Sequence, residues 1–564
     1  MNFKEFKYER PNLEELTGKV EDLLHRFEAA KSLEEAEGCL REYNDLSGHL
    51  STQLELASIR FSIDTRDEFY KKENDYWDEH EPMFEKLDFL FKKAVLASPY
   101  REELKKKLPE TYFTMAQQDQ DAFSEEIIED LQKENQLSSE YDTLIASAQI
   151  DFQGKTYTLA QLGALTESPD RELRKAASEA SWGFFEENEE KFDRIFDDMV
   201  KTRTAIAKKL GFDSFVDLAY LRMHRMGWDR KDVEKYRKMI RETVVPVCNE
   251  LYERQQKRLG LDKLAYYDLN LEYPEGNAKP EGSAEDTLEA GRSFYHELSE
   301  ESGEFIDLML DSGLMDVLAK TGKQSGGYMT FLPDYKVPFI FSNFNGTSGD
   351  INVLTHEAGH AFQGYQSRNI EPAELVMPTE ECCEIHSMSM EFFAWPYIEK
   401  FCGEQADKYR FAHLADATKF LPYGALVDHF QHEVYEHPDM TPEERKACWR
   451  KLDKIYRPHL DFEDNRFADK GTWWFKQGHI WGAPFYYIDY TLAQVCAFQF
   501  WSRLQKKDPE AWTDYLKLCR VGGTKPFLKL IKEGNLKSPF QEGVLADLMK
   551  EIGQWLKEHD TVQE

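Results

Sequence analysis

The stretch VLTHEAGHAF, residues 353–362, contains the pattern HExxH, formed by His356, Glu357 and His360. On a helix, residues four apart lie one above the other on the same face, so both imidazoles can bind one ion. Neutral imidazole suits zinc, and two of them leave room for a third protein ligand and a water. Glu357 would lie beside that water and accept its proton as a general base. The stretch therefore predicts a zinc-binding helix of the kind found in metallopeptidases.

The residues that flank the motif argue against a pair of surface histidines on an ordinary helix. With 15 histidines in 564 residues, an accidental HExxH occurs in roughly one such chain in twenty or thirty, so the pattern needs support from its context. Val353 and Leu354 precede it, and Ala361 and Phe362 follow it. An exposed helix would not need these apolar residues, so we expect a buried helix.

The segment upstream of the motif, GGYMTFLPDYKVPFIFSNFNGTSGD (326–350), alternates aromatic and β-branched residues and breaks at Pro333. We predict two short strands and then a Gly-rich loop at 346–349. The zinc-binding helix should begin near Asp350, with that residue as its N-cap. A strand and a Gly-rich loop can bind an extended peptide backbone. The candidate substrate-binding residues are Gly327, Gly346 and Gly349.

The third metal ligand has to come from elsewhere in the chain. A metzincin would continue as HExxHxxGxxH, but Gln363 and Gln366 stand where its glycine and third histidine should be. The remaining option is a glutamate on a following helix, which we predict for residues 380–395. Spacing alone does not choose among the four candidates, which are Glu380, Glu381, Glu384 and Glu391. Glu380 and Glu381 also fit as first-turn acids that are favoured by the helix dipole.

Two further groups of histidines and tyrosines lie downstream. The segment GHIWGAPFYYIDY (478–490) combines His479 with three tyrosines, and Pro484 is expected to interrupt its helix. The segment 428–437 contains three histidines, but it offers no adjacent base and is more typical of a packed helix. We therefore expect one metal ion per chain.

The rest of the chain is predominantly helical. Leu16, Val20, Leu23 and Phe27 follow the spacing of one buried helix face. A hairpin is predicted at 150–162, and the next helix should start with Ser168 as N-cap and Pro169 in its first position. Long helices should then continue to about residue 260, and 272–286 should be a loop. The predicted fold is mostly α, with a small sheet beside the HExxH helix.

Composition restricts the partners and the compartment. The chain has 105 acidic and 71 basic residues, a formal charge of −34, which argues against nucleic acid and anionic membranes as partners. No apolar run is long enough to span a bilayer, and the N-terminus lacks the apolar core of a signal peptide. Eight cysteines without a paired framework indicate reduced thiols. We expect a cytoplasmic protein, and the sequence leaves open whether it forms a homo-oligomer.

The motifs together resemble a known family. HEAGHAF (356–362), followed twenty-four residues after His360 by Glu384 in EIHSMSMEFF, resembles the thimet oligopeptidase and oligoendopeptidase F family of zinc peptidases. The Gly-rich loop before the motif and the segment 478–490 look most like the bacterial oligoendopeptidase F or Pz-peptidase branch. The resemblance covers roughly residues 150–550 in the order of its features.

The resemblance implies roles for particular residues. The third zinc ligand would be Glu384, completing the site with His356 and His360. His479 and a tyrosine would stabilise the oxyanion of the tetrahedral intermediate, with Tyr490 favoured and Tyr486 next. The resemblance also implies an ellipsoidal, two-lobed helical body whose deep central channel has zinc on its floor.

The domain assignment and the function follow from this picture. Residues 1–165 would form an N-terminal helical region that contributes to the channel wall, and residues 166–564 the catalytic domain. The implied activity is zinc-dependent hydrolysis of internal bonds in short oligopeptides, because a channel admits short peptides and excludes folded proteins. Two alternatives are a metallocarboxypeptidase with the same zinc chemistry and a non-catalytic helical binding protein, although the latter would not need Glu357.

Overall fold

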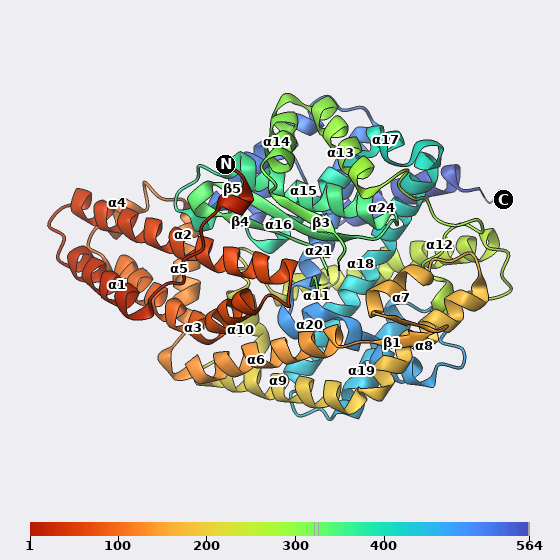
Figure 1. The fold of residues 1–564 in the computed structure, drawn as a ribbon, viewed down its shortest axis with the longest axis horizontal. Helices are drawn as coiled ribbons and strands as arrows, with labels where there is room; N and C mark the ends of the chain where they lie inside the picture. Colours follow the sequence, from red (N-terminus) through yellow and green to blue (C-terminus); the bar gives the residue numbers. More distant parts are fainter. Residues whose placement is uncertain (321, 325, 562–564) are drawn as a thin grey trace.

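The N-terminal region consists of long helices that pack around a small core of their own. The computed structural model describes residues 1–320, 322–324 and 326–561. The apolar face predicted for the first helix is buried and packs against the second and third helices. Figure 1 shows these helices extending to one side of the body. The helices of this region are α1 (Leu13–Glu28), α2 (Leu33–Ile63), α3 (Glu68–Ala97), α4 (Arg101–Leu104), α5 (Glu110–Ala122) and α6 (Ile128–Ala146).

The predicted hairpin is present, with a tight turn at Gly154 (φ +77°). Its strands are β1 (Ile150–Phe152) and β2 (Lys155–Tyr157), which pair antiparallel. The prediction that Ser168 caps the next helix was wrong. After α7 (Leu159–Leu165), α8 (Arg171–Glu187) begins with Asp170 as its N-cap, and the Asp170 carboxylate accepts hydrogen bonds from two backbone N–H groups. A carboxylate caps as well as a hydroxyl and is also stabilised by the helix dipole.

Long helices continue as predicted, and the 272–286 loop ends where Ser283 caps the following helix. A single π-helical turn joins α11 to α12. The helices of this part are α9 (Glu189–Lys209), α10 (Phe215–Arg222), α11 (Arg230–Met239), α12 (Val245–Arg258), α13 (Ala284–Leu298) and α14 (Glu300–Asp311).

A three-stranded sheet lies beside the HExxH helix. The two predicted strands are β4 (Tyr328–Leu332) and β5 (Val337–Phe344), which pair antiparallel. The sequence analysis missed β3 (Met315–Leu318), which pairs parallel to β5 and has only Val317 fully buried. The strand order is β3-β5-β4, so β4 is an edge strand. An edge strand presents unpaired backbone groups to which an extended peptide can be added.

The HExxH helix is α15 (Gly349–Ser367), which starts one residue before Asp350. The prediction that Asp350 is the N-cap was wrong, because Ser348 occupies that position. The Asp350 carboxylate instead accepts hydrogen bonds from the N–H groups of Asn345 (2.9 Å) and Gly346 (2.8 Å). Gly346 has a φ of +81°, which turns the loop back toward the helix. Asp350 thus fixes the Gly-rich loop against the start of α15.

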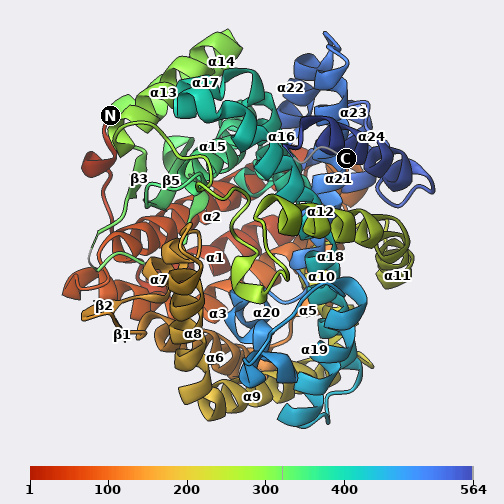
Figure 2. The same ribbon diagram turned by 90° about the vertical axis from the view of Figure 1, so that its right-hand side faces the viewer.

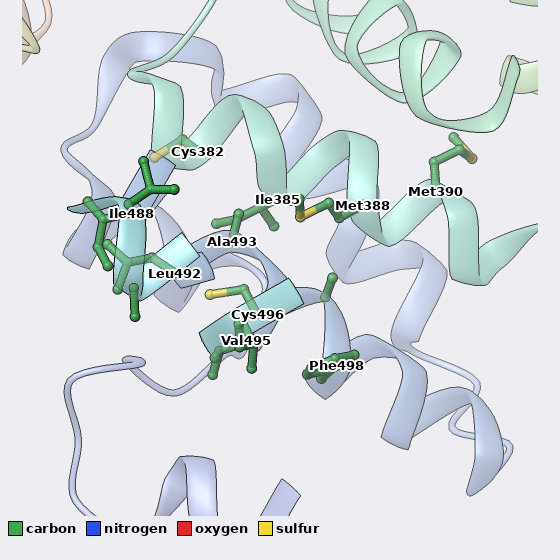
Figure 3. Close-up of a cluster of buried hydrophobic side chains, with 14 of the residues drawn as sticks. Cys382, Ile385, Met388, Met390, Ile488, Leu492, Ala493, Val495, Cys496 and Phe498 are labelled. Atoms are coloured by element: carbon green, nitrogen blue, oxygen red, sulfur yellow. The ribbon is translucent and has the colours of Figure 1, made fainter. Parts of the chain in front are cut away.

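The C-terminal half is helical, and α16 packs against both α15 and α21. Ile385 and Met388 of α16 meet Leu492 and Cys496 of α21 in a buried apolar interface (Figure 3). Pro484 lies in the break between α20 and α21, as predicted. The helices are α16 (Glu380–Phe393), α17 (Glu399–Cys402), α18 (Ala406–Glu436), α19 (Pro442–Tyr456), α20 (Gly478–Gly482), α21 (Tyr487–Gln505), α22 (Ala511–Val521), α23 (Phe527–Glu533) and α24 (Val544–His559).

A channel runs along α2 and α3. A cavity of about 730 Å³ lies between α2 and α3 on one side and α6, α9 and α10 on the other, and it reaches the 482–484 turn. A cavity of about 350 Å³ lies between α2 and the edge strand β4. Both are lined by Tyr43, Ser47, Ser51 and Asp88. The hollow therefore extends from the sheet to the segment that carries His479.

The two halves of the body contribute different parts of the site. Figure 2 shows α13, α14 and α17 at one end and α6, α9 and α19 at the other. The sheet, α15 and α16 belong to the first half and α20 to the second. The predicted mostly helical, two-lobed fold with a channel and a small sheet beside the HExxH helix is confirmed. In the described part of the chain, no helix is long and apolar enough to cross a membrane.

Candidate metal centre

The close packing of α15 on α16 brings the metal-binding groups together. A Cβ atom on Gly359 would lie 2.6 Å from the Cα of Ser387 and 2.8 Å from the carbonyl oxygen of His386. Only glycine permits this approach, because real Cβ atoms do not come so near to a neighbouring backbone. The glycine inside HEAGH thus sets the separation of the two helices and places Glu384 over the histidines.

The predicted ligand set converges on one point. The Nε2 atoms of His356 and His360 lie 3.2 Å and 3.4 Å from Oε2 of Glu384. Among the described residues, this is the one group of three or more metal-ligating side chains whose ligand atoms all lie within 4.8 Å of one another. Burial alone would raise the pKa of Glu384, but in the metal-free site the positive charge of His360 and hydrogen bonds from both imidazoles hold that pKa well below its ordinary value. Glu384 is therefore a carboxylate, the form that can bind a metal ion.

Glu391, which the spacing also allowed as the third ligand, orients the His356 ring instead. Glu391 Oε1 accepts a hydrogen bond from Nδ1 of His356 at 2.6 Å, and its Oε2 contacts Nε2 of His413 at the same distance. A carboxylate on Nδ1 fixes the ring so that Nε2 faces Glu384. Glu381 accepts from the indole of Trp228 and contacts neither ligating histidine. Of the four candidates, Glu384 has the geometry of the third ligand.

Glu357 projects from α15 beside the ligands. Its side chain is almost fully buried, and burial raises the pKa of its carboxyl. A raised pKa suits a group that has to accept a proton and then release it. The position that a Cβ of Gly327 would take lies 3.7 Å from Glu357 Oε1. The absence of a side chain at Gly327 keeps the space between the sheet and this carboxylate open.

The turn between α20 and α21 brings two tyrosines and a histidine to the same place. The Tyr486 hydroxyl donates to Glu384 Oε1 at 2.6 Å, and the Tyr490 hydroxyl lies 3.3 Å from Nε2 of His479. Burial raises the pKa of both tyrosines well above the ordinary value. Burial also lowers the pKa of His479. Near pH 7, all three are therefore neutral groups that can donate a hydrogen bond.

The sequence analysis missed the residue that sets the tautomer of His479. The Gln477 Oε1 accepts from the Tyr423 hydroxyl at 2.8 Å, so its amide NH₂ must be the group 3.2 Å from Nδ1 of His479. Nδ1 therefore accepts, and the ring proton resides on Nε2. His479 thus presents an N–H on the side of Tyr490. Gln477 lies two residues before His479, but nothing in the sequence distinguishes it from a surface glutamine.

Two buried arginines, which the sequence analysis also missed, bind the backbone of this turn. Arg203 on α9 donates to the carbonyl oxygens of Ile480 (3.3 Å) and Trp481 (2.5 Å). Arg225 donates to the carbonyl oxygen of Phe485 at 2.6 Å and to Asp489 at 3.0 Å. Such carbonyls have no partner at the end of a short helix unless a side chain supplies one. No local pattern marks these arginines, because they are about 260–280 residues away from the turn.

The glycines predicted to bind substrate and the second histidine cluster do not have the contacts expected of binding sites. The N–H of Gly346 is bonded to Asp350, and the N–H of Gly349 to the Thr347 hydroxyl, so neither is free to bind a peptide. His432 contacts the Tyr220 hydroxyl at 3.1 Å, as expected for a packed helix. This histidine lies outside the metal-ligating group found among the described residues.

A helix-borne HExxH pair completed by a glutamate from the next helix, with a buried glutamate beside it, defines a metallopeptidase. Comparison with known protein families identifies the group of metallopeptidases to which the chain belongs. Residues 164–550 match peptidase family M3, and residues 3–123 match the peptidase M3 N-terminal domain. The chain belongs to peptidase family M3.

Relatives within the family carry related names. The chain is 23% identical over 420 residues to the oligoendopeptidase F homolog of Borreliella burgdorferi, covering 70% of this chain and 69% of that one. It is 24% identical over 388 residues to the chromosomal oligoendopeptidase F of Lactococcus lactis subsp. cremoris, covering 64% and 60%. A solved structure of Pz peptidase A with an inhibitor superposes with a TM-score of 0.97 at 50% identity, covering 99% of both chains. The predicted family is thus confirmed.

Proposed function

We propose that this protein is a zinc-dependent endopeptidase that hydrolyses internal bonds of short oligopeptides. The separation of the ligand atoms carries the proposal. Zinc–nitrogen and zinc–oxygen bonds of about 2.05 Å in a tetrahedron place neighbouring ligands about 3.3 Å apart. The Nε2 atoms of His356 and His360 lie 3.2 Å and 3.4 Å from Glu384 Oε2. Two imidazoles and one carboxylate also leave a fourth position for water.

Each surrounding residue then has a chemical task. When bound, zinc would supply a water of lowered pKa and polarise the scissile carbonyl. Glu357 accepts the proton of that water and later passes it to the leaving amine. His479, through its Nε2–H, and Tyr490, through its hydroxyl, donate to the oxygen on which negative charge develops, and one such donor is typically worth about 3 kcal/mol. Tyr486 holds Glu384 in place through a hydrogen bond of 2.6 Å.

The substrate would bind along the edge strand. The outer edge of β4 borders the channel, and Gly327, just before it, leaves room in front of Glu357. We include Gly346 and Gly349 as residues that shape the loop at the end of β5. The region 1–165 contributes the opposite channel wall, and 166–564 carries the metal site. A channel of this kind favours short peptides, and we expect cytoplasmic peptides as substrates.

The test is hydrolysis of an internally quenched peptide, blocked at both ends, by wild type and Glu357→Gln at equal zinc content. We expect internal cleavage by the wild type and a loss of several orders of magnitude in the variant, because the zinc-bound water loses its base. Mass spectrometry of the products gives the position of the cleaved bond.

The other outcomes point to specific alternatives. If the blocked peptide stays intact while a free-ended peptide loses residues from its C-terminus, the protein is a carboxypeptidase with the same zinc chemistry. If the wild type binds no zinc at pH 7, the metal assignment is wrong. Equal activity of wild type and Glu357→Gln at full zinc occupancy would show that another group is the base.

A further inference from the structure

Phe485, in the turn between α20 and α21, has a backbone conformation that phenylalanine rarely adopts. Its φ is +69°, in the left-handed region that favours glycine. Among the described residues that have a positive φ and are not glycine, Phe485 is the only buried one. A strained backbone of this kind persists only where the surrounding structure imposes it, and such strain is concentrated at functional sites.

Buried side chains bind both backbone polar groups of Phe485. Its N–H donates to Oε1 of Gln431 at 2.8 Å, and its carbonyl oxygen accepts from Nη2 of Arg225 at 2.6 Å. Gln431 is 1% exposed, and its amide NH₂ donates to the carbonyl oxygen of Val427 (3.3 Å), one turn earlier on α18. This second bond fixes the orientation of the amide, so that Oε1 is the atom that faces Phe485.

The ring of Phe485 is held as well as its backbone. It packs edge-on against the imidazole of His432, with the ring centres 5.1 Å apart, and it also lies near Tyr435, at 5.8 Å. Gln431, His432 and Tyr435 all belong to the segment 428–437, which the sequence analysis singled out for its histidines. In the fold, this part of α18 binds the turn that contains Phe485.

The conformation of Phe485 bears on the position of Tyr490. Phe485 precedes α21 by two residues, and Tyr490 lies in the first turn of that helix, so the φ of Phe485 sets the direction in which the chain enters it. Nη2 of Arg225, which binds the Phe485 carbonyl oxygen, also donates to Asp489 at 3.0 Å. This donor therefore joins the turn to the start of α21. The Tyr490 hydroxyl, one residue further on, lies 3.3 Å from Nε2 of His479.

We infer that Gln431 and Arg225 are positioning residues, which hold Phe485 in its left-handed conformation and thereby place the Tyr490 hydroxyl beside His479. The inference rests on the proposed function, since it concerns one of the proposed oxyanion donors. Such a donor contributes most when it needs no reorganisation during the reaction. If the backbone of the turn relaxed, α21 would begin at another angle and carry Tyr490 away, whereas the metal ligands on α15 and α16 would stay in place.

The test is the activity of Gln431→Met, which keeps the length of the side chain and removes the acceptor, on the quenched peptide at matched zinc content. We expect kcat to fall about 10–100-fold with KM nearly unchanged, because a misplacement of about 1 Å can cost 10²-fold. Gln431→Glu should restore most of the rate, because a buried, protonated carboxyl can make both hydrogen bonds. The control is Gln255→Met, which removes another buried glutamine that donates to backbone carbonyls, and it should keep the wild-type kcat.

A double-mutant cycle separates positioning from a general loss of stability. If Gln431 acts through Tyr490, then Gln431→Met should lower kcat by no more than about twofold in the Tyr490→Phe background. A fall of the same size in both backgrounds shows that the hydrogen bond acts on something other than Tyr490, and the inference is then wrong. Should Gln431→Met fail to fold, Gln431→Asn provides the same test, because it keeps the amide and withdraws the acceptor by one methylene.

Crystal structures of wild type and Gln431→Met provide a measurement that does not depend on turnover. We expect the φ of Phe485 to become negative in the variant, and the Tyr490 hydroxyl to move away from Nε2 of His479. If Phe485 keeps its positive φ and Tyr490 its position, the inference is overturned. If wild type cleaves no peptide but the variant shows the expected displacement, the proposed activity fails and the positioning role stands.

Discussion

Gly359→Ala tests whether the spacing of α15 and α16 builds the metal centre. The added Cβ would lie 2.6 Å from Ser387 Cα, 2.8 Å from the His386 carbonyl oxygen and 3.0 Å from Met390 Cβ. Carbon atoms in ordinary contact are about 3.5–4.0 Å apart. Two of these neighbours are backbone atoms, which cannot rotate away as a side chain can. The helices therefore have to separate by about 1 Å at this point.

The separation has two measurable consequences. Overpacking a core typically costs 1–3 kcal/mol, and the better helix propensity of alanine offsets about 1 kcal/mol of this. We expect a net loss of up to about 2 kcal/mol in stability. Glu384 is one turn before Ser387 on α16, so it moves with the helix. Metal sites tolerate shifts of about 0.2 Å in ligand distance, and a shift of about 1 Å should weaken metal binding at least tenfold.

The assay is zinc affinity by competition with a chromophoric chelator, together with thermal unfolding of the metal-free protein. Gly183→Ala is the matched control, since Gly183 lies within α8 and a Cβ there would meet nothing within 4 Å. We expect the control to keep its zinc affinity and gain up to about 1 kcal/mol in stability. If Gly359→Ala binds zinc as tightly as the wild type and is no less stable than the control, the close approach of the two helices does not set the site.

Three further predictions follow from single contacts. Glu391→Gln should weaken zinc binding about 10–100-fold in the chelator assay, because the carboxylate that orients His356 is lost. Tyr490→Phe should lower kcat about 10²–10³-fold at unchanged zinc content and nearly unchanged KM, because the proposed oxyanion donor is removed. Arg222 and Arg203 lower the pKa of Glu134 to about 2, against the effect of burial. The stability that Glu134 confers is thus complete above about pH 4.5 and lost as the pH falls toward 2, and it is worth about 3 kcal/mol. In urea unfolding, the difference in free energy of unfolding between wild type and Glu134→Gln should be about 1 kcal/mol smaller at pH 3.5 than at pH 7.

The parts of the fold that the sequence could predict depend on short-range patterns. The helix 353–362 follows from the spacing of two histidines and the apolar residues around them. The strands β4 and β5 follow from alternation that stops at Pro333. The failures are equally local: near Ser168 and near Asp350, two polar residues that are two positions apart could each cap a helix, and only the direction of the backbone decides between them. Asp170 makes the capping bonds of α8, whereas the Asp350 carboxylate binds the preceding loop and α15 begins without a side-chain cap.

The parts that the sequence could not predict depend on pairs far apart in the chain. Glu384 and Glu391 lie seven residues apart on the same helix, so both were candidates for the third ligand. Their different surroundings arise because α15 crosses α16 at Gly359, which places one carboxylate over both histidines and the other behind His356. Only the family resemblance distinguished Glu384 beforehand. The side chains that hold His479 and its turn come from distant parts of the chain, and no sequence motif links them to the His479 segment.

The turn that carries His479 is also linked to helix α6. Glu134 on α6 accepts from Arg203 at 2.6 Å, and Arg203 in turn holds the carbonyl oxygens of Ile480 and Trp481. Arg203 is almost fully buried, so without Glu134 its charge would have no carboxylate partner among the described residues. Removing one partner of a buried ion pair typically costs 3–5 kcal/mol of stability, because the other charge stays buried without a partner. A chain shortened to residues 166–564 keeps the metal ligands but loses Glu134. We therefore expect it to be much less stable, and to lose more in kcat than in zinc affinity, because α15 and α16 do not depend on this pair and the proposed oxyanion donors do.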